Sequence, residues 1–233
     1  WTPLEALTDR AVLEPVLREI EQGDREALER VRRYRRELDT WLPAARACLA
    51  AGRPLPELPA APEHPLAHRH APTALYRAMI EPLAPYALRG AIWYQGEHNC
   101  LRGDREVYTV KMEALIDGWR QRWQQGAFPF YYVQLAPWSG YAERDKADYP
   151  AFCRAQQRVM ETVTNTGMVV TSDLVDDIKN VHPRNKQGVG RRLALWALRH
   201  TYGREQVVCR GPVPAAVEAS EGGLLLAFDH AEG

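Results

Sequence analysis

Several features that define large protein classes are absent from this sequence. No apolar run approaches the roughly 18 residues that a membrane-spanning helix needs. No stretch has the pattern of a signal or transit peptide. Basic and acidic residues balance at 30 each, so no net charge attracts nucleic acid or an anionic membrane. We therefore expect neither nucleic acid nor a membrane among the partners.

Cysteine is scarce and gives no metal signature. Four cysteines are spread along the chain: Cys48, Cys100, Cys153 and Cys209. None belongs to a CxxC pair, so zinc ligation is not indicated. His64, His68 and His70 fall together in a proline-rich stretch, but without carboxylates or cysteines at ligand spacing. We interpret that stretch as a polar linker and expect no metal and no cofactor.

The first part of the chain has a helical pattern. Apolar residues recur at spacings of three and four within residues 4–50. Gln22-Gly-Asp24 predicts a break between two helices, because glycine ends a helix and Asp24 can begin the next. Residues 51–72 are rich in proline and alanine, which favours an extended surface linker.

From residue 73 onward, helix and strand patterns alternate. The expected strands cover 91–94, 130–135 and 168–171, and the expected helices cover 74–83, 107–123, 151–163 and 187–200. This alternation predicts an α/β fold with a parallel sheet and helices on both faces. Three strands are few for such a sheet, and the strand-like residues 223–228 have no expected partner. We therefore expect a piece of a longer protein whose N-terminal strands are missing.

The first strand ends abruptly in polar residues that suit a site. Ligands of open α/β sheets bind outside the carboxyl ends of the strands, and Gln95-Gly96-Glu97 follow Tyr94 there. Gly96 lets the backbone turn close to a ligand. Gln95 and Asn99 carry amide donors that could serve an oxyanion hole. Glu97 could orient a catalytic histidine, or it could merely pair with Arg89 or Arg102 at the surface.

His182 is the strongest candidate for a catalytic side chain. It lies in a loop between a strand and a helix expected to start near Asn185, and Pro183 restricts that loop. A histidine and a carboxylate are two members of a triad that activates a nucleophile. Three aspartates on the same loop are rivals of Glu97 for orienting the ring: Asp173, Asp176 and Asp177.

Aromatic residues near these strand ends could stack against sugar rings. Trp93 lies within a strand that is covered on both faces, so we expect it in the core. Trp138 lies in the loop 136–140 and is the better platform for a substrate ring.

Two sequence blocks resemble the sialate O-acetylesterase family, which belongs to the SGNH (GDSL-like) hydrolases. The first covers residues 73–97 and ends in Ala91-Ile-Trp-Tyr-Gln-Gly-Glu97, and the second runs from His182-Pro-Arg-Asn-Lys186 to residue 194. Residues 128–136 and 1–7 fit as well. The resemblance implies a flavodoxin-like α/β/α sandwich that hydrolyses acetyl esters on carbohydrates. It also implies export to the periplasm or the cell exterior.

The resemblance assigns roles to particular residues. In the family a serine in an upstream Gly-Gln-Ser-Asn-like block is acylated, His182 matches its base, and Glu97 matches the proposed third member. Family members often have aspartate two residues before this histidine, where Asn180 stands here, which favours Glu97. The serines of this chain lie in no such block: Ser139, Ser172 and Ser220. We therefore expect the nucleophile upstream and this piece to be inactive alone.

The sequence thus supports a domain division and three functional hypotheses. Residues 1–72 combine a family-like start with a helical insertion and linker, 73–205 form the C-terminal part of the hydrolase domain, and 206–233 begin a β-rich segment. The leading hypothesis is a serine-dependent carbohydrate O-acetylesterase. The alternative is a non-hydrolytic glycan-binding module using Trp138 and Tyr141. A third is that the helices of 11–72 dock a partner protein through an exposed apolar face.

Overall fold

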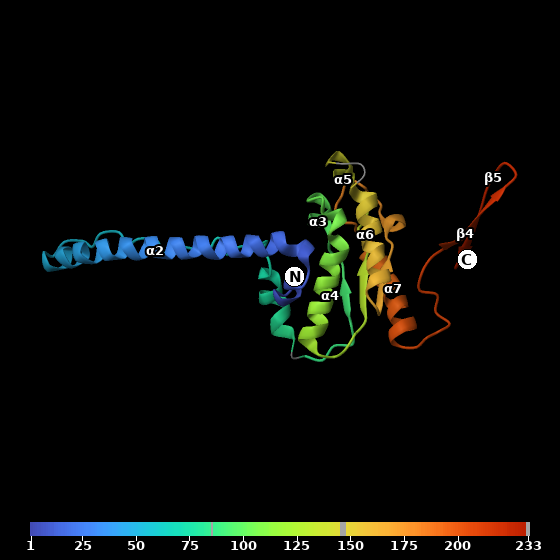
Figure 1. Ribbon diagram of the computed structural model, residues 1–233, viewed down its shortest axis with the longest axis horizontal. Helices are drawn as coiled ribbons and strands as arrows, with labels where there is room; N and C mark the ends of the chain where they lie inside the picture. Colours follow the sequence, from blue (N-terminus) through green and yellow to red (C-terminus); the bar gives the residue numbers. More distant parts are fainter. Residues whose placement is uncertain (85, 145–147, 232–233) are drawn as a thin grey trace. The chain divides into compact units, whose positions relative to one another are not determined.

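The computed structural model describes residues 1–84, 86–144 and 148–231 (Figure 1). It divides into two compact units, Trp1–Pro85 and Tyr86–Gly233. No helix in the described part of the chain is both long enough and apolar enough to cross a bilayer.

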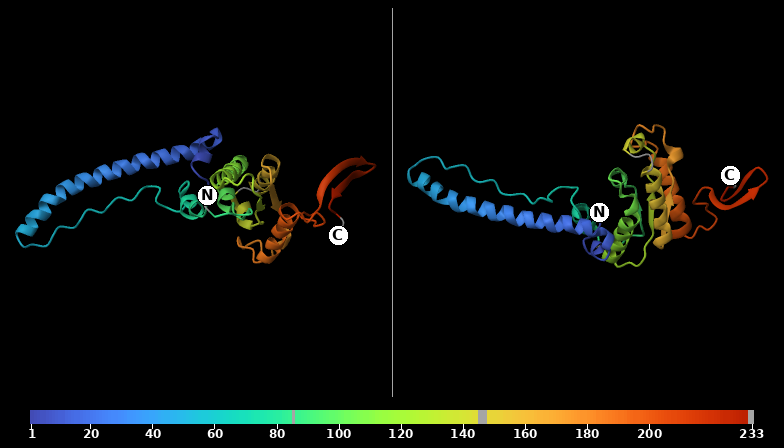
Figure 2. Two further views of the ribbon diagram at one scale, coloured as in Figure 1. Left: turned by 90° about the horizontal axis from the view of Figure 1, so that it is seen from below. Right: turned by 45° about the horizontal axis from the view of Figure 1, so that its top comes forward.

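The first unit is built around one long helix. Its elements are α1 (Glu5–Thr8), η1 (Ala11–Leu13), α2 (Glu14–Ala50), η2 (Tyr76–Ile80) and η3 (Glu81–Leu83). Residues 51–72 run back along α2 without forming a helix or strand (Figure 2). The Trp41 indole N–H donates to the Pro56 carbonyl at 3.0 Å, which ties this return segment to the helix. The expected linker is therefore extended, as its prolines predict.

The expected break at Gln22-Gly-Asp24 is wrong, because α2 continues through it. Gly23 is buried beneath Leu66 of the return segment, and a Cβ at Gly23 would lie only 2.6 Å from Leu66 Cδ1. Gln22 Nε2 donates to Glu26 Oε1 at 3.0 Å, one helical turn further on. This glycine thus serves close packing and does not end the helix. The expected helix at 74–83, in contrast, is divided into the π-helical η2 and the 3₁₀-helical η3, and Pro82 lies near the start of η3.

The second unit contains a three-stranded parallel sheet, which confirms the predicted α/β fold. The strands are β1 (Ala91–Trp93), β2 (Phe130–Val133) and β3 (Thr166–Val169), in the order β1-β2-β3. Trp93 is aligned with Tyr132, and Tyr132 with Met168. The helices around this sheet are α3 (Glu97–Leu101), η4 (Asp104–Glu106), α4 (Tyr108–Trp123), α5 (Ser139–Arg144), α6 (Asp148–Thr162), η5 (Ser172–Leu174), α7 (Lys186–Trp196) and η6 (Ala197–Thr201).

Helices pack on both faces of this sheet, as its apolar strands predict, although Ile92 of β1 stays exposed. Successive side chains of a strand point to opposite faces. On one face Phe130 packs against Trp119 of α4 with ring centroids 5.8 Å apart, and the Tyr132 hydroxyl donates to the Gln156 carbonyl of α6 at 2.7 Å. On the other face Tyr131 belongs to a buried cluster with Trp196 of α7.

The C-terminal residues form a hairpin that the sequence did not reveal. β4 (Val213–Ser220) pairs antiparallel with β5 (Gly223–Asp229), so the expectation that residues 223–228 lack a partner is wrong. Pro214 and a shift in register between Pro214 and Ala216 obscure the strand pattern of β4. Gly222 has a φ of +87°, which the tight turn between the strands uses.

Candidate functional site

The turn after β1 is built around Gly96. Its φ is +150°, a conformation that favours glycine, and an added Cβ would lie 3.1 Å from Tyr108 Oη and 3.3 Å from the Phe152 ring. The Tyr108 hydroxyl donates to the Gln95 carbonyl at 3.3 Å. Burial raises the pKa of Tyr108, so it stays a neutral donor. The sequence predicted that a ligand could approach Gly96 closely. On the side where a Cβ would lie, that space is occupied by Tyr108 and Phe152 of the protein itself.

Glu97 opens the short helix α3 directly after this turn. Its Oε2 accepts a hydrogen bond from the Gly96 amide at 3.0 Å, and its side chain is half-buried. A carboxylate in the first turn of a helix is favoured by the unpaired backbone N–H groups there. Glu97 is thus held at the carboxyl end of β1, where a catalytic carboxylate is expected.

Asn99 braces the same segment through a second carboxylate. Its Nδ2 donates to Asp104 Oδ2 at 2.7 Å, and Lys111 Nζ lies 2.7 Å from the same oxygen. One amide hydrogen of Asn99 is therefore committed to the turn that follows α3. An oxyanion role for Asn99 would have to use its other amide hydrogen.

His182 is exposed in the loop between η5 and α7. Its backbone N–H donates to Asn180 Oδ1 at 2.9 Å, while Asn185 Oδ1 caps α7 by accepting from the Gly188 amide at 2.9 Å. Pro183 is buried between these two turns. The helix therefore starts where the sequence predicted, with Asn185 as its N-cap, and the imidazole lies outside the core.

Contacts between loops bring the histidine segment to the strand ends. The Trp138 indole N–H donates to the Lys179 carbonyl at 3.1 Å, and the Ser139 amide donates to the Ile178 carbonyl at 2.8 Å. From the other side, Lys186 Nζ lies 4.6 Å from the centroid of the Tyr94 ring. The loop that carries His182 is therefore fastened to residues that follow β1 and β2.

No hydrogen bond or ion pair joins Glu97 to the His182 side chain within the described residues. Two of the three rival acids, Asp173 and Asp177, form hydrogen bonds with other groups. Asp173 bonds to the Arg192 guanidinium at 2.7 Å, and that hydrogen bond lowers the pKa of Asp173. Asp177 Oδ1 accepts from the Lys179 amide at 2.8 Å. Which carboxylate orients His182 therefore stays a prediction, and Asp173 is the rival that a basic side chain, Arg192 of α7, holds.

The aromatic candidates divide between core and surface. Trp93 is buried, with its ring edge-on to Trp119 at 5.8 Å, which confirms its expected place in the core. Tyr141 is also buried, at 3% exposure, and stacks on Tyr149 at 5.4 Å. The expectation that Tyr141 offers a glycan platform is therefore wrong, because its ring is used within the protein. Trp138 is partly exposed.

A buried polar group beneath the site was not predicted. Gln156 of α6 is 1% exposed; its Oε1 accepts from the Leu135 amide at 2.9 Å, and its Nε2 donates to the Val133 carbonyl at 3.3 Å. It thereby holds the backbone where β2 ends. The signal was the helical spacing of Phe152, Gln156 and Val159, which puts the glutamine on the apolar face of α6.

The described residues contain no cluster of three or more histidine, cysteine or acidic side chains that could hold a metal. His64 instead pairs with Asp24 at 3.2 Å and accepts from the Leu66 amide. Cys100, in the same short helix α3 as Glu97, is a buried free thiol whose pKa burial raises to about 12. Such a thiol is a poor nucleophile at neutral pH.

Comparison with known proteins identifies the family to which this α/β fold and its strand-end site belong. Residues 65–199 match the carbohydrate esterase family of sialic acid-specific acetylesterases, and the chain belongs to that family. Sialate O-acetylesterase from Mus musculus is 37% identical over 176 residues, covering 67% of this chain and 32% of that protein. The Homo sapiens protein of that name is 33% identical over 174 residues, covering 67% of this chain and 33% of its own length.

A solved structure is similar as well. The crystal structure of a carbohydrate acetylesterase from Xanthomonas citri superposes with a TM-score of 0.59 at 34% identity, covering 67% of this chain and 36% of that one. The chain therefore spans about a third of the length of the relatives it matches. The predicted family is confirmed, and the named relatives are esterases.

Proposed function

We propose that the protein containing this sequence is a serine-dependent carbohydrate O-acetylesterase, with a nucleophilic serine upstream of residue 1. The observation that carries the proposal is the fastening of the His182 loop beside the Gln95–Glu97 turn, in a chain that belongs to an acetylesterase family. None of Ser139, Ser172 and Ser220 is hydrogen-bonded to the His182 side chain in the described part of the chain. The names of the relatives favour hydrolysis over mere glycan binding.

The chemistry assigned to His182 is general base and then general acid catalysis. His182 takes the proton of the serine hydroxyl as the serine oxygen bonds to the acetyl carbonyl carbon. The tetrahedral oxyanion collapses, the sugar hydroxyl leaves with the proton from His182, and an acetyl-enzyme remains. Water then attacks with His182 as base, and acetate and the free serine result. Glu97 stabilises the imidazolium, and Gln95, Gly96 and Asn99 border the oxyanion and the substrate.

The sheet is proposed to continue beyond the three strands seen here. Ile92 on the edge strand β1 is 69% exposed, although β-strands of α/β folds are normally covered. Further strands outside this sequence would complete a flavodoxin-like α/β/α sandwich, of which 73–205 form the C-terminal part. Residues 206–233 would begin a β-rich segment. An acetylated glycan substrate suits a location in the periplasm or outside the cell.

Covalent labelling tests the serine mechanism directly. The full-length protein is treated with a fluorophosphonate, digested and analysed by mass spectrometry. The adduct is expected on a serine upstream of residue 1, and acetate release from an O-acetylated sugar should stop in proportion to labelling. Labelling of Ser139, Ser172 or Ser220, or full activity after complete labelling elsewhere, would refute the assignment.

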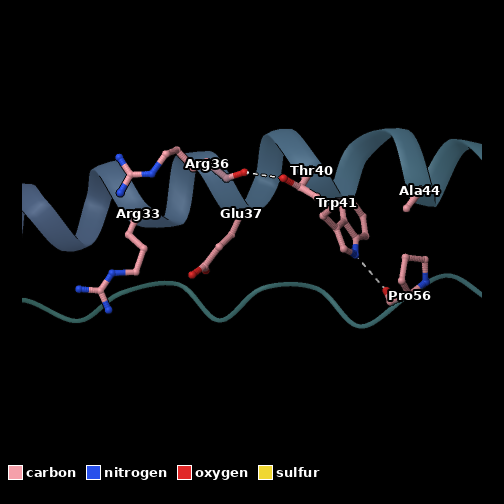
Figure 3. Close-up of a pocket in the computed structure, with 7 residues that line it drawn as sticks. All are labelled: Arg33, Arg36, Glu37, Thr40, Trp41, Ala44 and Pro56. Atoms are coloured by element: carbon pink, nitrogen blue, oxygen red, sulfur yellow. Dashed lines mark hydrogen bonds between the residues drawn. The ribbon is translucent and has the colours of Figure 1, made fainter.

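A second role, docking of a partner protein by α2 and its return segment, is favoured by exposed apolar side chains. Four of them lie on α2: Leu28, Val31, Leu42 and Leu49. A pocket of about 470 Å³ also lies on α2, and Figure 3 shows Arg33 and Arg36 at its edge and Trp41 against Pro56. Apolar side chains that form a contiguous exposed patch often mark an interaction site.

Stability measurements separate docking from internal packing. If the apolar side chains of α2 face solvent in the isolated full-length protein, Leu42→Ser and Leu49→Ser should leave Tm nearly unchanged. If they pack inside the protein, each substitution should lower Tm by several degrees, since each removes a buried leucine. That second result would exclude the docking role.

A further inference from the structure

Trp138 is joined to the histidine loop by its indole nitrogen. The Nε1–H donates to the Lys179 carbonyl at 3.1 Å, and the neighbouring Ser139 amide donates to the Ile178 carbonyl at 2.8 Å. These two hydrogen bonds connect the segment after β2 to consecutive residues of the loop. The loop between η5 and α7 has no helix or strand of its own to fix residues 178–179.

The orientation of Trp138 is itself fixed by its neighbours. A Cβ on Gly140 would overlap the six-membered ring of Trp138, so the ring lies directly against the backbone of α5. Tyr141 meets the ring edge-on at 5.1 Å. Tyr141 is held in turn by its stack on Tyr149, whose hydroxyl donates to the Leu135 carbonyl at 2.8 Å. These contacts hold the Trp138 ring in one orientation, with its indole N–H directed at the loop.

A continuous series of hydrogen bonds leads from Trp138 to His182. Lys179, whose carbonyl binds the indole, donates its amide to Asp177 Oδ1 at 2.8 Å. The Asn180 amide donates to the Asp177 carbonyl at 3.1 Å, and Asn180 Oδ1 accepts from the His182 amide at 2.9 Å. Each turn thus fixes the next, and a shift at Lys179 is passed to the backbone of His182.

We propose that Trp138 is a positioning residue, whose indole N–H holds the loop that carries His182 in place. This inference rests on the proposed esterase function. It gives Trp138 a role different from that of a platform for a sugar ring. Because general base catalysis depends on small differences in geometry, a loosened loop lowers the rate of the chemical step.

The test is Trp138→Phe in the full-length protein, which keeps an aromatic ring and removes the donor. Two substrates are compared, 4-nitrophenyl acetate, which has no sugar, and an O-acetylated sugar. The positioning role predicts a fall in kcat of about tenfold on both substrates with KM little changed, in keeping with the loss of one hydrogen bond. Gly140→Ala, which displaces the ring, should act in the same direction.

Trp196→Phe is the matched control. It makes the same tryptophan-to-phenylalanine change at a buried position of α7, but in the described structure the Trp196 Nε1 has no hydrogen-bond partner. We expect it to lower Tm while kcat stays close to that of the parent. A fall in kcat in Trp196→Phe equal to that in Trp138→Phe would show a general packing effect and overturn the proposal.

The remaining outcomes separate this inference from the proposed function. Unchanged kcat on both substrates, or a raised KM on the sugar substrate alone, would overturn the positioning role, and the second result would restore the sugar platform. If the parent itself releases no acetate, the esterase proposal fails. Amide hydrogen exchange then still decides the hydrogen-bond claim. The Asn180 and His182 amides should exchange faster in Trp138→Phe than in the parent, and equal rates would refute it.

Discussion

The ammonium group of Lys186 lies 4.6 Å from the centroid of the Tyr94 ring. Tyr94 follows β1 and precedes the Gln95–Glu97 turn, whereas Lys186 is the first residue of α7, just after His182-Pro183-Arg184-Asn185. Two sequence blocks that are far apart in the chain are thus joined by one cation–π contact. In the proposed mechanism, this contact holds the segment of His182, the general base, beside that of Glu97, the carboxylate that orients it.

Removing that contact should weaken the connection without unfolding the protein. We expect Lys186→Met to lower the free energy of unfolding by about 0.5–1 kcal/mol, because the ammonium is exposed and the contact is only partly shielded from water. Urea denaturation measures the change. Arg191→Met, an exposed position one turn further along α7, is the control and should change stability by less. Equal effects would show that any positive charge on this helix contributes as much.

Replacement of Gly96 and of Gly190 by alanine should change the free energy of unfolding in opposite directions. Gly96→Ala adds a Cβ 3.1 Å from Tyr108 Oη at a φ of +150°, so we expect a loss of about 1–3 kcal/mol. Gly190 lies within α7 with nothing within 4 Å of an added Cβ. Gly190→Ala should gain about 0.5–1 kcal/mol, because alanine favours the helix. Thermal unfolding checks both, and a neutral Gly96→Ala would contradict the crowding seen at this turn.

The Asp173–Arg192 pair should make stability depend on pH in the acid range. The hydrogen bond from Arg192 lowers the folded-state pKa of Asp173, so the pair contributes above the unfolded pKa near 3.9. That contribution is lost as the pH falls through the folded pKa. Asp173→Asn should therefore cost stability at pH 7, by at most about 1 kcal/mol because Asp173 is largely exposed, and nothing below the folded pKa. Urea unfolding between pH 2 and 7 tests this, and a pH-independent cost would rule the pair out as the cause.

Substitution of Gln156 should lower the free energy of unfolding more than substitution of its exposed neighbour Gln157. Gln156→Leu leaves the Leu135 amide and the Val133 carbonyl without their partners, so we expect a loss of about 1–3 kcal/mol. Gln157→Leu, on the solvent side of α6, should stay within about 0.5 kcal/mol of the parent. Urea denaturation compares the two. Similar effects would mean that the hydrogen bonds to β2 add nothing beyond helix propensity.

The sequence predicted the sheet well because its signals are local. Buried strands such as 130–133 are short apolar runs, and the alternation with amphipathic helices implies parallel pairing. Gly23 could not be interpreted correctly, since its role depends on Leu66, which approaches from a distant part of the chain. The hairpin of β4 and β5 was missed because proline is rare within strands, and Pro214 lies in β4.

The site was only partly foreseeable for the same reason. Strand ends and caps are visible in sequence, so Gln95–Glu97 and the loop before Asn185 could be singled out. The bond from Trp138 to Lys179 could not, because it joins two loops whose spacing only the folded chain sets. The sequence named Asp173 as a rival of Glu97, and it could not show the pairing of Asp173 with Arg192, nineteen residues further on.

Acetate release by the full-length protein and its His182→Ala variant tests the central claim most directly. His68→Ala, which removes an exposed histidine of the return segment, is the matched control. We expect kcat on an O-acetylated sugar to fall by about 10⁴ or more in His182→Ala, since triad members act as a unit, and to stay unchanged in His68→Ala. A folded His182→Ala variant with near-parental kcat would contradict the account.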